Sequence, residues 1–361
     1  MKFSVDQKQF SDSIGLASRG IGRPSGHPIL QNLKIDADPS GVRVTGFDLS
    51  MGIEVFCPAT VEEPGSFTFT GKLLADIVAK LGGMIACAMD GDALRIDSLS
   101  GSFSVPGLSS EEYPTLPEVS GEPVELPLDI LSQAISRVSP FCSTEETKQI
   151  LTGIHLTKTD NLELASTDGH RLSVEVLKGL DGDGFELTLP SRALSLLPLI
   201  AKASGSNSIS MAWETGCCVI KCGSVTLTTR TVDGQYPNYG ALIPADFAGT
   251  LTVDRAALVA AIDRVNLFSP GGVVVLQITE EMITVSAEGR DAGSGRDRVA
   301  CQGGTKIDIA FNGAYLSGAL NAIKPASEVQ LRYNTATSPV VLCPLSGPDY
   351  LHLVMPVQIR R

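Results

Sequence analysis

Apolar and polar residues follow the same pattern three times along this chain. In each copy, apolar positions at i, i+4 and i+7 predict an amphipathic helix, over residues 6–19, 128–138 and 254–266. Asp6 and Asp254 stand at the start of two of these helices, where a carboxylate caps the first turn. The copies align at offsets of 121 and then 127 residues, with these apolar matches: Val5/Leu126/Val253, Phe10/Leu131/Leu258, Ile14/Ile135/Ile262 and Ala17/Val138/Val265.

A second helix also recurs, and a strand leads directly into it. Each copy begins with alternating apolar and polar residues and then changes to helical spacing, which predicts helices over 71–81, 191–202 and 312–324. Short alternating runs such as 42–47 and 224–232 predict antiparallel strands. Each copy is therefore expected to contain strands, a helix, more strands, a second helix and final strands.

Three copies of one unit indicate three domains. The chain has 361 residues, so each copy has about 120 residues, which is enough for its own hydrophobic core. We expect an α+β fold of three repeated domains, each with two helices packed on antiparallel sheets, at 1–122, 123–247 and 248–361. The stretches 117–123 and 244–246 are typical of linkers between such domains.

The net charge of −12 argues at first against a nucleic-acid partner, because proteins that bind phosphate backbones are usually basic. The charge is unevenly divided along the chain. The six predicted helices carry ten basic and six acidic residues, whereas the rest of the chain carries 18 basic and 34 acidic residues. If the helices line one surface, that surface attracts phosphates while the remainder repels them.

Composition is typical of a globular protein, with 43% hydrophobic and 19% charged residues. No stretch reaches 18 apolar residues and the N-terminus turns polar at once, so we expect a cytoplasmic protein without a membrane span or a signal peptide. Cys217, Cys218 and Cys222 could suggest a metal site, but no His or Cys cluster accompanies them. We expect them to be small core residues on a β-hairpin, and we expect no metal and no cofactor.

Several short strings add to the threefold repeat. They are Arg23-Pro24 with His27-Pro28-Ile29-Leu30-Gln31-Asn32-Leu33, Gly46-Phe47-Asp48-Leu49, Thr167-Asp168-Gly169-His170-Arg171-Leu172, Val232-Asp233-Gly234-Gln235-Tyr236-Pro237-Asn238-Tyr239, Phe311-Asn312-Gly313-Ala314-Tyr315 and Val354-Met355-Pro356-Val357. Together with the repeat, these strings resemble the bacterial DNA polymerase III beta subunits, the sliding clamps. The resemblance runs in order over the whole chain.

The resemblance implies a protein without catalytic activity that raises the processivity of a DNA polymerase. Two chains would form a head-to-tail homodimer, a ring of six domains with twelve helices lining the hole. Double-stranded DNA would pass through the hole independently of its sequence, because phosphates rather than bases are contacted. The implied place of action is the nucleoid in the cytoplasm, with no membrane partner.

DNA-binding candidates are basic residues on or beside the predicted helices. Arg23, in the loop after the first helix, matches a DNA-contacting position of the family. The full set that the resemblance implies is Arg23, Lys72, Lys80, Arg137, Lys148, Arg192, Lys202, Arg264 and Lys324.

The resemblance also implies a pocket for linear peptides at the junction of the second and third domains. Its apolar residues would accept Leu or Phe anchors, Gly169 would let backbone approach closely, and polar contacts would come from His170, Arg171 and Asn312. The implied partners are the DNA polymerase III alpha subunit, the clamp loader and repair polymerases, all through linear clamp-binding motifs. The pocket residues are Leu151, Thr167, Gly169, His170, Arg171, Leu172, Pro237, Leu242, Asn312, Tyr315, Leu353, Val354, Met355, Pro356 and Val357.

The chain departs from the family pattern at three places that affect individual contacts. Gly240-Ala241 stands where some members have a basic residue, Gln358 replaces an arginine, and Lys148-Gln149-Ile150 replaces an aromatic-rich loop.

Two other functions stay open at this point. Asp168 and His170, two residues apart, could act as an acid–base or metal pair in an enzyme, although an Asp-Gly turn beside a histidine also explains them. The net charge is also compatible with a peptide-binding scaffold that does not bind DNA.

Overall fold

A computed structural model describes residues 1–22, 27–180, 182–289, 292–324, 326–347 and 349–358. The chain forms two compact units, which are described separately. The first unit consists of Met1–Ser132 and Leu196–Thr231, and the second of Gln133–Ser195 and Val232–Arg361. The helices are α1 (Gln7–Ala17), α2 (Gly71–Val78), α3 (Leu128–Val138), α4 (Ser191–Leu194), α5 (Leu197–Ser204), α6 (Arg255–Asn266) and α7 (Gly313–Ala322).

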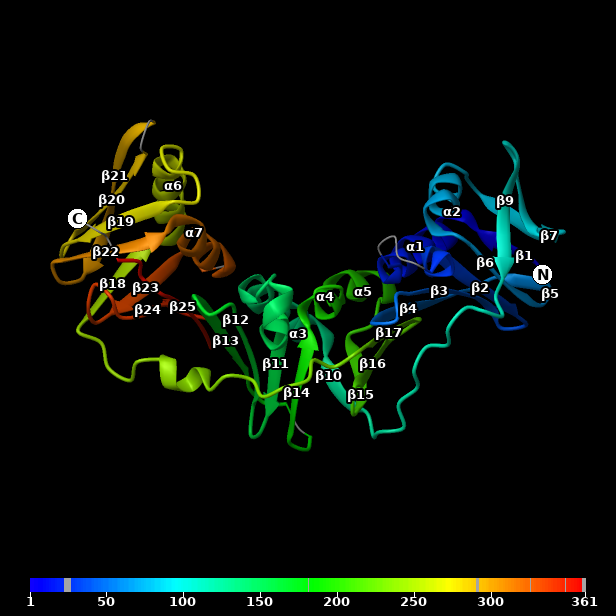
Figure 1. Cartoon of the computed structure of the whole chain (residues 1–361), viewed down its shortest axis with the longest axis horizontal. Coiled ribbons are helices and arrows are strands. Elements are labelled where there is room, and N and C mark those ends of the chain that lie inside the picture. The colour runs from blue at the N-terminus through cyan, green and yellow to red at the C-terminus, as the bar shows by residue number, and fades with distance from the viewer. Residues whose placement is uncertain (23–26, 181, 290–291, 325, 348, 359–361) are drawn as a thin grey trace. The chain divides into compact units, whose positions relative to one another are not determined.

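The first unit is built on an antiparallel sheet whose strands follow the order β10-β15-β16-β17-β4-β3-β2-β6-β9-β8-β7-β1-β5. Its strands are β1 (Lys2–Asp6), β2 (Asn32–Asp38), β3 (Gly41–Phe47), β4 (Met51–Cys57), β5 (Thr60–Glu63), β6 (Gly65–Thr70), β7 (Met84–Asp90), β8 (Ala93–Ser98), β9 (Gly101–Ser109), β10 (Val124–Pro127), β15 (Ser208–Glu214), β16 (Cys217–Cys222) and β17 (Val225–Thr229). Helix α1 packs on β4 and on α2 (Figure 1).

The second unit has a sheet of the same kind, in the order β14-β11-β12-β13-β25-β24-β23-β18-β21-β20-β19-β22. Its strands are β11 (Gly153–Lys158), β12 (Leu162–Thr167), β13 (Arg171–Leu177), β14 (Phe185–Pro190), β18 (Gly249–Asp254), β19 (Val273–Ile278), β20 (Met282–Gly289), β21 (Gly293–Gly303), β22 (Ile307–Asn312), β23 (Glu328–Tyr333), β24 (Val340–Pro344) and β25 (Tyr350–Val354). Helices α6 and α7 lie together against β19–β22 (Figure 1).

Two long strands change neighbours partway along their length. Strand β9 pairs with β8 over 101–106 and with β6 over 107–109. Strand β21 pairs with β20 over 293–300 and with β18 over 301–303. A Cβ at Gly107 would lie 2.6 Å from the Phe69 ring, so only glycine permits the close approach at the change in β9.

Polar side chains set the helix starts as the pattern predicts. The Asp6 carboxylate accepts a hydrogen bond from the Gln9 amide, and the Asp254 carboxylate accepts one from the Ala257 amide. These bonds satisfy amides that have no partner within the helix. The α+β class is confirmed, and so is the strand predicted at 42–47; of the run predicted at 224–232, only Val225–Thr229 forms a strand.

The helix predicted over 191–202 is wrong, because two short helices occupy this segment. Helix α4 ends at Leu194, and α5 begins at Leu197 with Pro198 in its first turn. Proline has no amide hydrogen to donate and its ring clashes with the preceding turn, so it is tolerated at a helix start but not inside one.

The cysteines behave as small core residues. All eight thiols are free. Cys218 and Cys222 are buried on β16, whose hairpin with β17 was expected, whereas Cys217 at the start of β16 is only partly buried. In the part of the chain that the structure describes, no three His, Cys, Asp or Glu residues are grouped to hold a metal ion. No helix of the described ranges has the length and apolar character needed to span a membrane.

Candidate functional site

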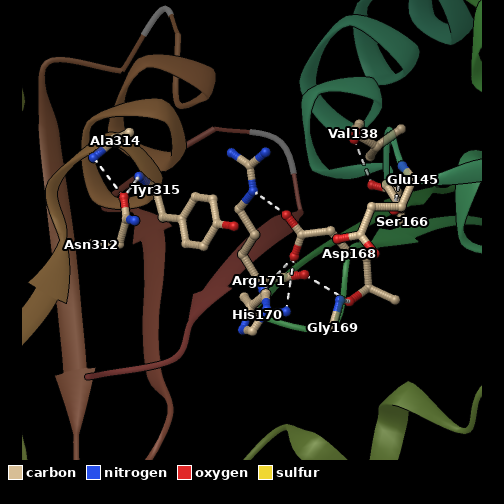
Figure 2. A network of polar contacts seen from close by, with 12 residues as sticks. Val138, Glu145, Ser166, Asp168, Gly169, His170, Arg171, Asn312, Ala314 and Tyr315 are labelled. Atoms are coloured by element: carbon tan, nitrogen blue, oxygen red, sulfur yellow. Dashed lines mark hydrogen bonds and ion pairs between the residues drawn. The ribbon is translucent and has the colours of Figure 1, made fainter. Parts of the chain in front are cut away.

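The tight turn between β12 and β13 is organised by the Asp168 side chain. Its Oδ1 accepts hydrogen bonds from the amides of His170 (2.9 Å) and Arg171 (3.0 Å), and its Oδ2 accepts one from Nε of Arg171 at 2.9 Å (Figure 2). Thr167 Oγ1 accepts from the Gly169 amide and donates to the Arg171 carbonyl. Gly169 has φ 93°, a conformation that few other residues adopt without strain.

The geometry of the turn disfavours an acid–base pair of Asp168 and His170. The Asp168 carboxylate is occupied by three hydrogen bonds within its own turn. The His170 ring stacks instead on Tyr315, with 5.9 Å between the ring centroids. The contacts therefore favour an Asp-Gly turn beside a histidine over an acid–base pair.

The C-terminal segment lies along this turn. Strand β25 pairs with β13, with Val354 opposite Arg171. Beyond the strand, the Met355 amide donates to the His170 carbonyl at 2.9 Å, and the Val357 amide donates to the Ala310 carbonyl of β22 at 2.8 Å. Residues 355–357 thus connect the β12–β13 turn to the strand that leads into α7.

Helix α7 contributes Asn312 and Tyr315 to the same place. Asn312 Oδ1 accepts hydrogen bonds from the amides of Ala314 and Tyr315, so it caps the helix (Figure 2). The guanidinium carbon of Arg171 lies 4.8 Å from the centre of the Tyr315 ring. The Nε of Arg171 and the Oδ1 of Asn312 already have partners, so part of the hydrogen-bonding capacity of these two side chains is used within the site.

The expected pocket residues divide into exposed and buried sets. Leu242 and Met355 are exposed apolar side chains, at 51% and 36%. Leu172 and Leu353 are buried in a small cluster that is covered by the linker residues Tyr239, Ile243 and Phe247. Leu151 and Pro237 lie in connecting segments, Leu151 within a 3-10 helix (Glu146–Thr152), and Val354 is fully buried.

The linker that carries Pro237 and Leu242 is attached to the sheet by aromatic contacts. The Tyr236 ring stacks on His155 with 4.5 Å between centroids, and the Tyr239 hydroxyl donates a hydrogen bond to the Glu163 carboxylate. Burial lowers the pKa of His155, although the nearby carboxylates of Glu186 and Glu163 oppose this shift. These contacts were not expected, because the spacing of residues does not show which side chains more than 70 positions apart touch in the fold.

The basic candidates also differ in their surroundings. Lys72, Lys80, Arg192, Lys202 and Lys324 are exposed. Two others are engaged by acids: Lys148 pairs with Glu145 at 3.1 Å and Arg264 pairs with Asp297 at 2.5 Å. Arg23 lies outside the described residues.

The surroundings of Arg137 do not favour the expected DNA-binding role. Its side chain is buried, its Nε donates to Glu175 at 2.8 Å, and a second guanidinium nitrogen pairs with the other oxygen of the same carboxylate. Glu175 is itself fully buried. A guanidinium held in this way stabilises the interior and cannot reach a phosphate. Its position in the last turn of α3 suggested an exposed charge. Helical spacing cannot show that Glu175, on another element, is buried beside it.

The fold and the site together define a class: three domains with helices packed on antiparallel sheets, as in DNA clamps. Comparisons with known proteins give the family. Residues 1–117, 125–238 and 240–358 match the N-terminal, central and C-terminal domains of the DNA polymerase III beta subunit. The chain therefore belongs to the beta sliding clamps, a family of non-catalytic processivity factors.

Individual relatives agree over their whole length. The beta sliding clamp of Synechococcus elongatus is 38% identical over 375 residues, covering 100% of both chains. The structure of the sliding clamp of Bartonella birtlesii bound to griselimycin has a TM-score of 0.93 at 28% identity, and covers 99% of this chain and 100% of that one. The Thermotoga maritima beta subunit has a TM-score of 0.94 at 23% identity over 99% and 100% of the two chains, which supports the fold.

Proposed function

We propose that two copies of this chain join head to tail into a six-domain ring that encircles double-stranded DNA, with domains at 1–122, 123–247 and 248–361. The observation that carries this proposal is a repeated strand pairing. Strand β4 pairs with β17, and the corresponding strand of the next copy, β13, pairs with β25. In the third copy, the strand equivalent to β4 and β13 is β21. The strand equivalent to the partners β17 and β25 is β9 of the first copy, so we propose that β21 of one subunit pairs with β9 of another.

The edges of these two strands suit such a contact. Over 101–106, β9 pairs only with β8, and over 293–300, β21 pairs only with β20, among the described residues. An exposed apolar side chain, Phe103 at 38%, lies on the free segment of β9, and Leu267, exposed at 76%, follows helix α6, which packs against β21. Two different complementary surfaces on one chain produce a head-to-tail contact, and a closed dimer results when the rotation returns to the start.

Within the ring, exposed basic residues would hold DNA through its phosphates. We assign this role to the helix residues Lys72, Arg192 and Lys202 and to Lys80 and Lys324, which follow α2 and α7. We also assign it to Arg23 and, less directly, to the paired Lys148 and Arg264. Such contacts do not read bases, so the ring slides, and retention depends on its closed topology. The place of action is then the nucleoid in the cytoplasm.

A second site would bind linear peptides of partner proteins. The exposed Met355 hydrogen-bonds through its amide to His170, whose ring stacks on Tyr315. We assign the exposed Leu242 and the remaining pocket residues to the same apolar and aromatic surface. The proposed partners are the DNA polymerase III alpha subunit, the clamp loader and repair polymerases, through clamp-binding motifs with Leu or Phe anchors. That a relative is described bound to griselimycin supports a ligand site in this family.

The ring is tested by topology. Protein loaded onto nicked circular DNA should stay bound through gel filtration at moderate salt, and it should be lost after a restriction enzyme linearises the circle. Equal loss from circular and linear DNA would contradict the ring.

The triple variant Lys72→Ala, Lys202→Ala, Lys324→Ala tests the inner wall. It should slide off linear DNA faster than wild type, and its DNA retention should depend less on salt concentration. Unchanged DNA retention in this variant would favour a scaffold that does not bind DNA.

The pocket is tested with a fluorescein-labelled peptide that carries Leu and Phe anchors. Met355→Ala should weaken its binding, while the dimer measured by sedimentation stays intact. A peptide that binds Met355→Ala and wild type equally would contradict the assignment of this surface.

A further inference from the structure

A continuous column of rings and guanidinium groups runs from the candidate pocket into the interior of the second unit. We propose that Phe141 and His352, which lie in this column but not at the pocket surface, are positioning residues that hold Arg171 and Tyr315 in the arrangement that receives a peptide. The inference rests on the proposed peptide pocket and adds the side chains that support it.

The distances describe an unbroken stack. The Arg171 guanidinium contacts two rings, 4.8 Å from the centre of Tyr315 and 5.2 Å from the centre of Phe141. Phe141 stacks on His352 with 4.5 Å between centroids and 20° between planes, and His352 contacts Tyr350 at 5.5 Å. Both cation–ring contacts lie within the roughly 6 Å over which the ring attracts a cation.

Arg171 has few other orientations available. Its Nε donates to Asp168 at 2.9 Å, which fixes the guanidinium from the side of the turn. On the side of α7, a Cβ placed at Gly318 would come within 3.2 Å of Nη1, so the small residue leaves the space that the guanidinium needs. The Tyr315 ring therefore rests on a guanidinium that Asp168 holds from the side of the turn (Figure 2), and the Phe141 ring lies 5.2 Å from the same group.

His352 is an unusual residue for its position, and this points to the ring as the property that matters. It is fully buried on β25, and within the described structure neither ring nitrogen has a hydrogen-bond partner. Burying such unpaired polar atoms is unfavourable, and a leucine would avoid the cost. A flat ring, however, offers Phe141 a face to stack on, which an aliphatic side chain cannot.

Substitutions at His352 and Phe141 separate ring stacking from simple filling of the interior. His352→Phe keeps a ring at this position, whereas His352→Leu keeps apolar volume without one. Phe141→Leu likewise removes the ring face that supports Arg171. A role in packing alone predicts similar behaviour for His352→Phe and His352→Leu, while a role in positioning predicts that only the leucine variants impair the pocket.

The experiment measures two properties of the full-length protein. The first is the NMR signal of the Arg171 Nε–H group without peptide, whose position reports the rings on both sides and whose exchange with water reports the bond to Asp168. The second is the affinity for the fluorescein-labelled peptide with Leu and Phe anchors. In Phe141→Leu and His352→Leu we expect a shifted, faster-exchanging signal and about three- to tenfold weaker peptide binding, the range of a lost ring contact.

Controls decide between the outcomes. Ile283→Val removes one methylene from strand β20, which pairs with β19 and β21 and not with the strand that carries His352, and should change neither property beyond the general loss of stability. His352→Phe should retain both. The inference is overturned if His352→Leu matches His352→Phe, or if either measured property is unchanged in the leucine variants. A wild-type protein that does not bind the peptide would instead overturn the proposed pocket, while the Arg171 signal still tests the stack.

Discussion

Arg137 and Arg171 are residues of one type whose roles differ because of their neighbours. Both form an ion pair with a carboxylate, and both lie against an aromatic ring. Arg137 is fully enclosed with Glu175, whereas Arg171 lies at the edge of the candidate pocket. The sequence predicts a basic residue at each position but does not show which carboxylate it meets.

Replacing Arg137 should affect stability and not DNA retention. Arg137→Ala leaves Glu175 as a buried charge without its partner, so the free energy of unfolding should fall by about 3–5 kcal/mol, as for other broken buried pairs. Urea unfolding measures this loss, with Lys202→Ala as the exposed control. A stable Arg137→Ala protein that loses DNA retention would contradict the burial of this side chain.

His352 should make the fold sensitive to acid. Burial, with a smaller contribution from Arg137, lowers the pKa of His352 to about 3, below the value of about 6.5 in an unfolded chain. The unfolded chain therefore binds a proton between these values and the folded chain does not, so the free energy of unfolding falls as the pH decreases from about 6.5 toward 3. The slope from this residue is at most about 1.4 kcal/mol per pH unit.

Denaturation at a series of pH values measures this slope. His352→Phe should remove that part of the dependence on pH, and replacement of the exposed His27 by Phe serves as the control. An unchanged slope in His352→Phe would assign the acid sensitivity to other groups.

At the scale of elements, the boundaries of strands decide which changes the fold tolerates. Val354 ends β25 and pairs with both Arg171 and Val340, so it belongs to the sheet. Residues 355–357 follow the strand and make single backbone hydrogen bonds to His170 and Ala310. These two segments, adjacent in sequence, therefore differ in what their removal would cost.

A truncation after Val354 should remove peptide binding and preserve the fold. The sheet keeps all pairs of β25, while the exposed Met355 and the bonds from 355 and 357 are lost. Peptide affinity should fall below detection, with the far-ultraviolet circular dichroism and the dimer unchanged. A truncation after Leu351, which cuts into β25, is the matched comparison and should unfold part of the sheet. Loss of the dimer in the protein truncated after Val354 would show that the residues beyond Val354 belong to the subunit contact.

For the whole molecule, the net charge and the repeat have consequences that no single element reveals. A charge of −12 spread evenly would repel DNA, whereas basic residues on helices and acidic residues elsewhere allow one surface to attract it. The repeat has a similar consequence for assembly, because two copies of a strand pairing within the chain assign the third to a neighbouring subunit.

The proposed contact between β9 and β21 is open to direct test. Phe103, exposed on β9, lies in the segment that has a free edge. Phe103→Arg should weaken the dimer about tenfold or more, because a charge would enter an apolar interface. Sedimentation measures the dimer, and Leu345→Arg, at an exposed position in the second unit, is the control. Peptide affinity should remain as in wild type, and an undiminished Phe103→Arg dimer would move the contact elsewhere.

Hydrophobic periodicity by itself determined most of the helices, the strands that lead into the second helix of each copy, the α+β class and the threefold repeat, because a helix or strand records its buried face in its own residues. Local polar residues likewise determined the caps at Asp6 and Asp254 and the Asp-Gly turn at 168–169. Pro198 also marks, in the sequence itself, the point where the helix predicted over 191–202 is interrupted, although apolar spacing alone extended that helix across it.

Only the tertiary structure decided which distant residues meet. The burial of Arg137 depends on Glu175, which lies 38 positions away, and the support of Arg171 depends on Phe141 and Tyr315, from separate elements. The division of the pocket residues into exposed and buried sets depends on a linker that packs over the sheet. Contacts of this kind arise from strand order and packing, which periodicity does not encode, so the sequence identifies the elements of the site and the fold determines their roles.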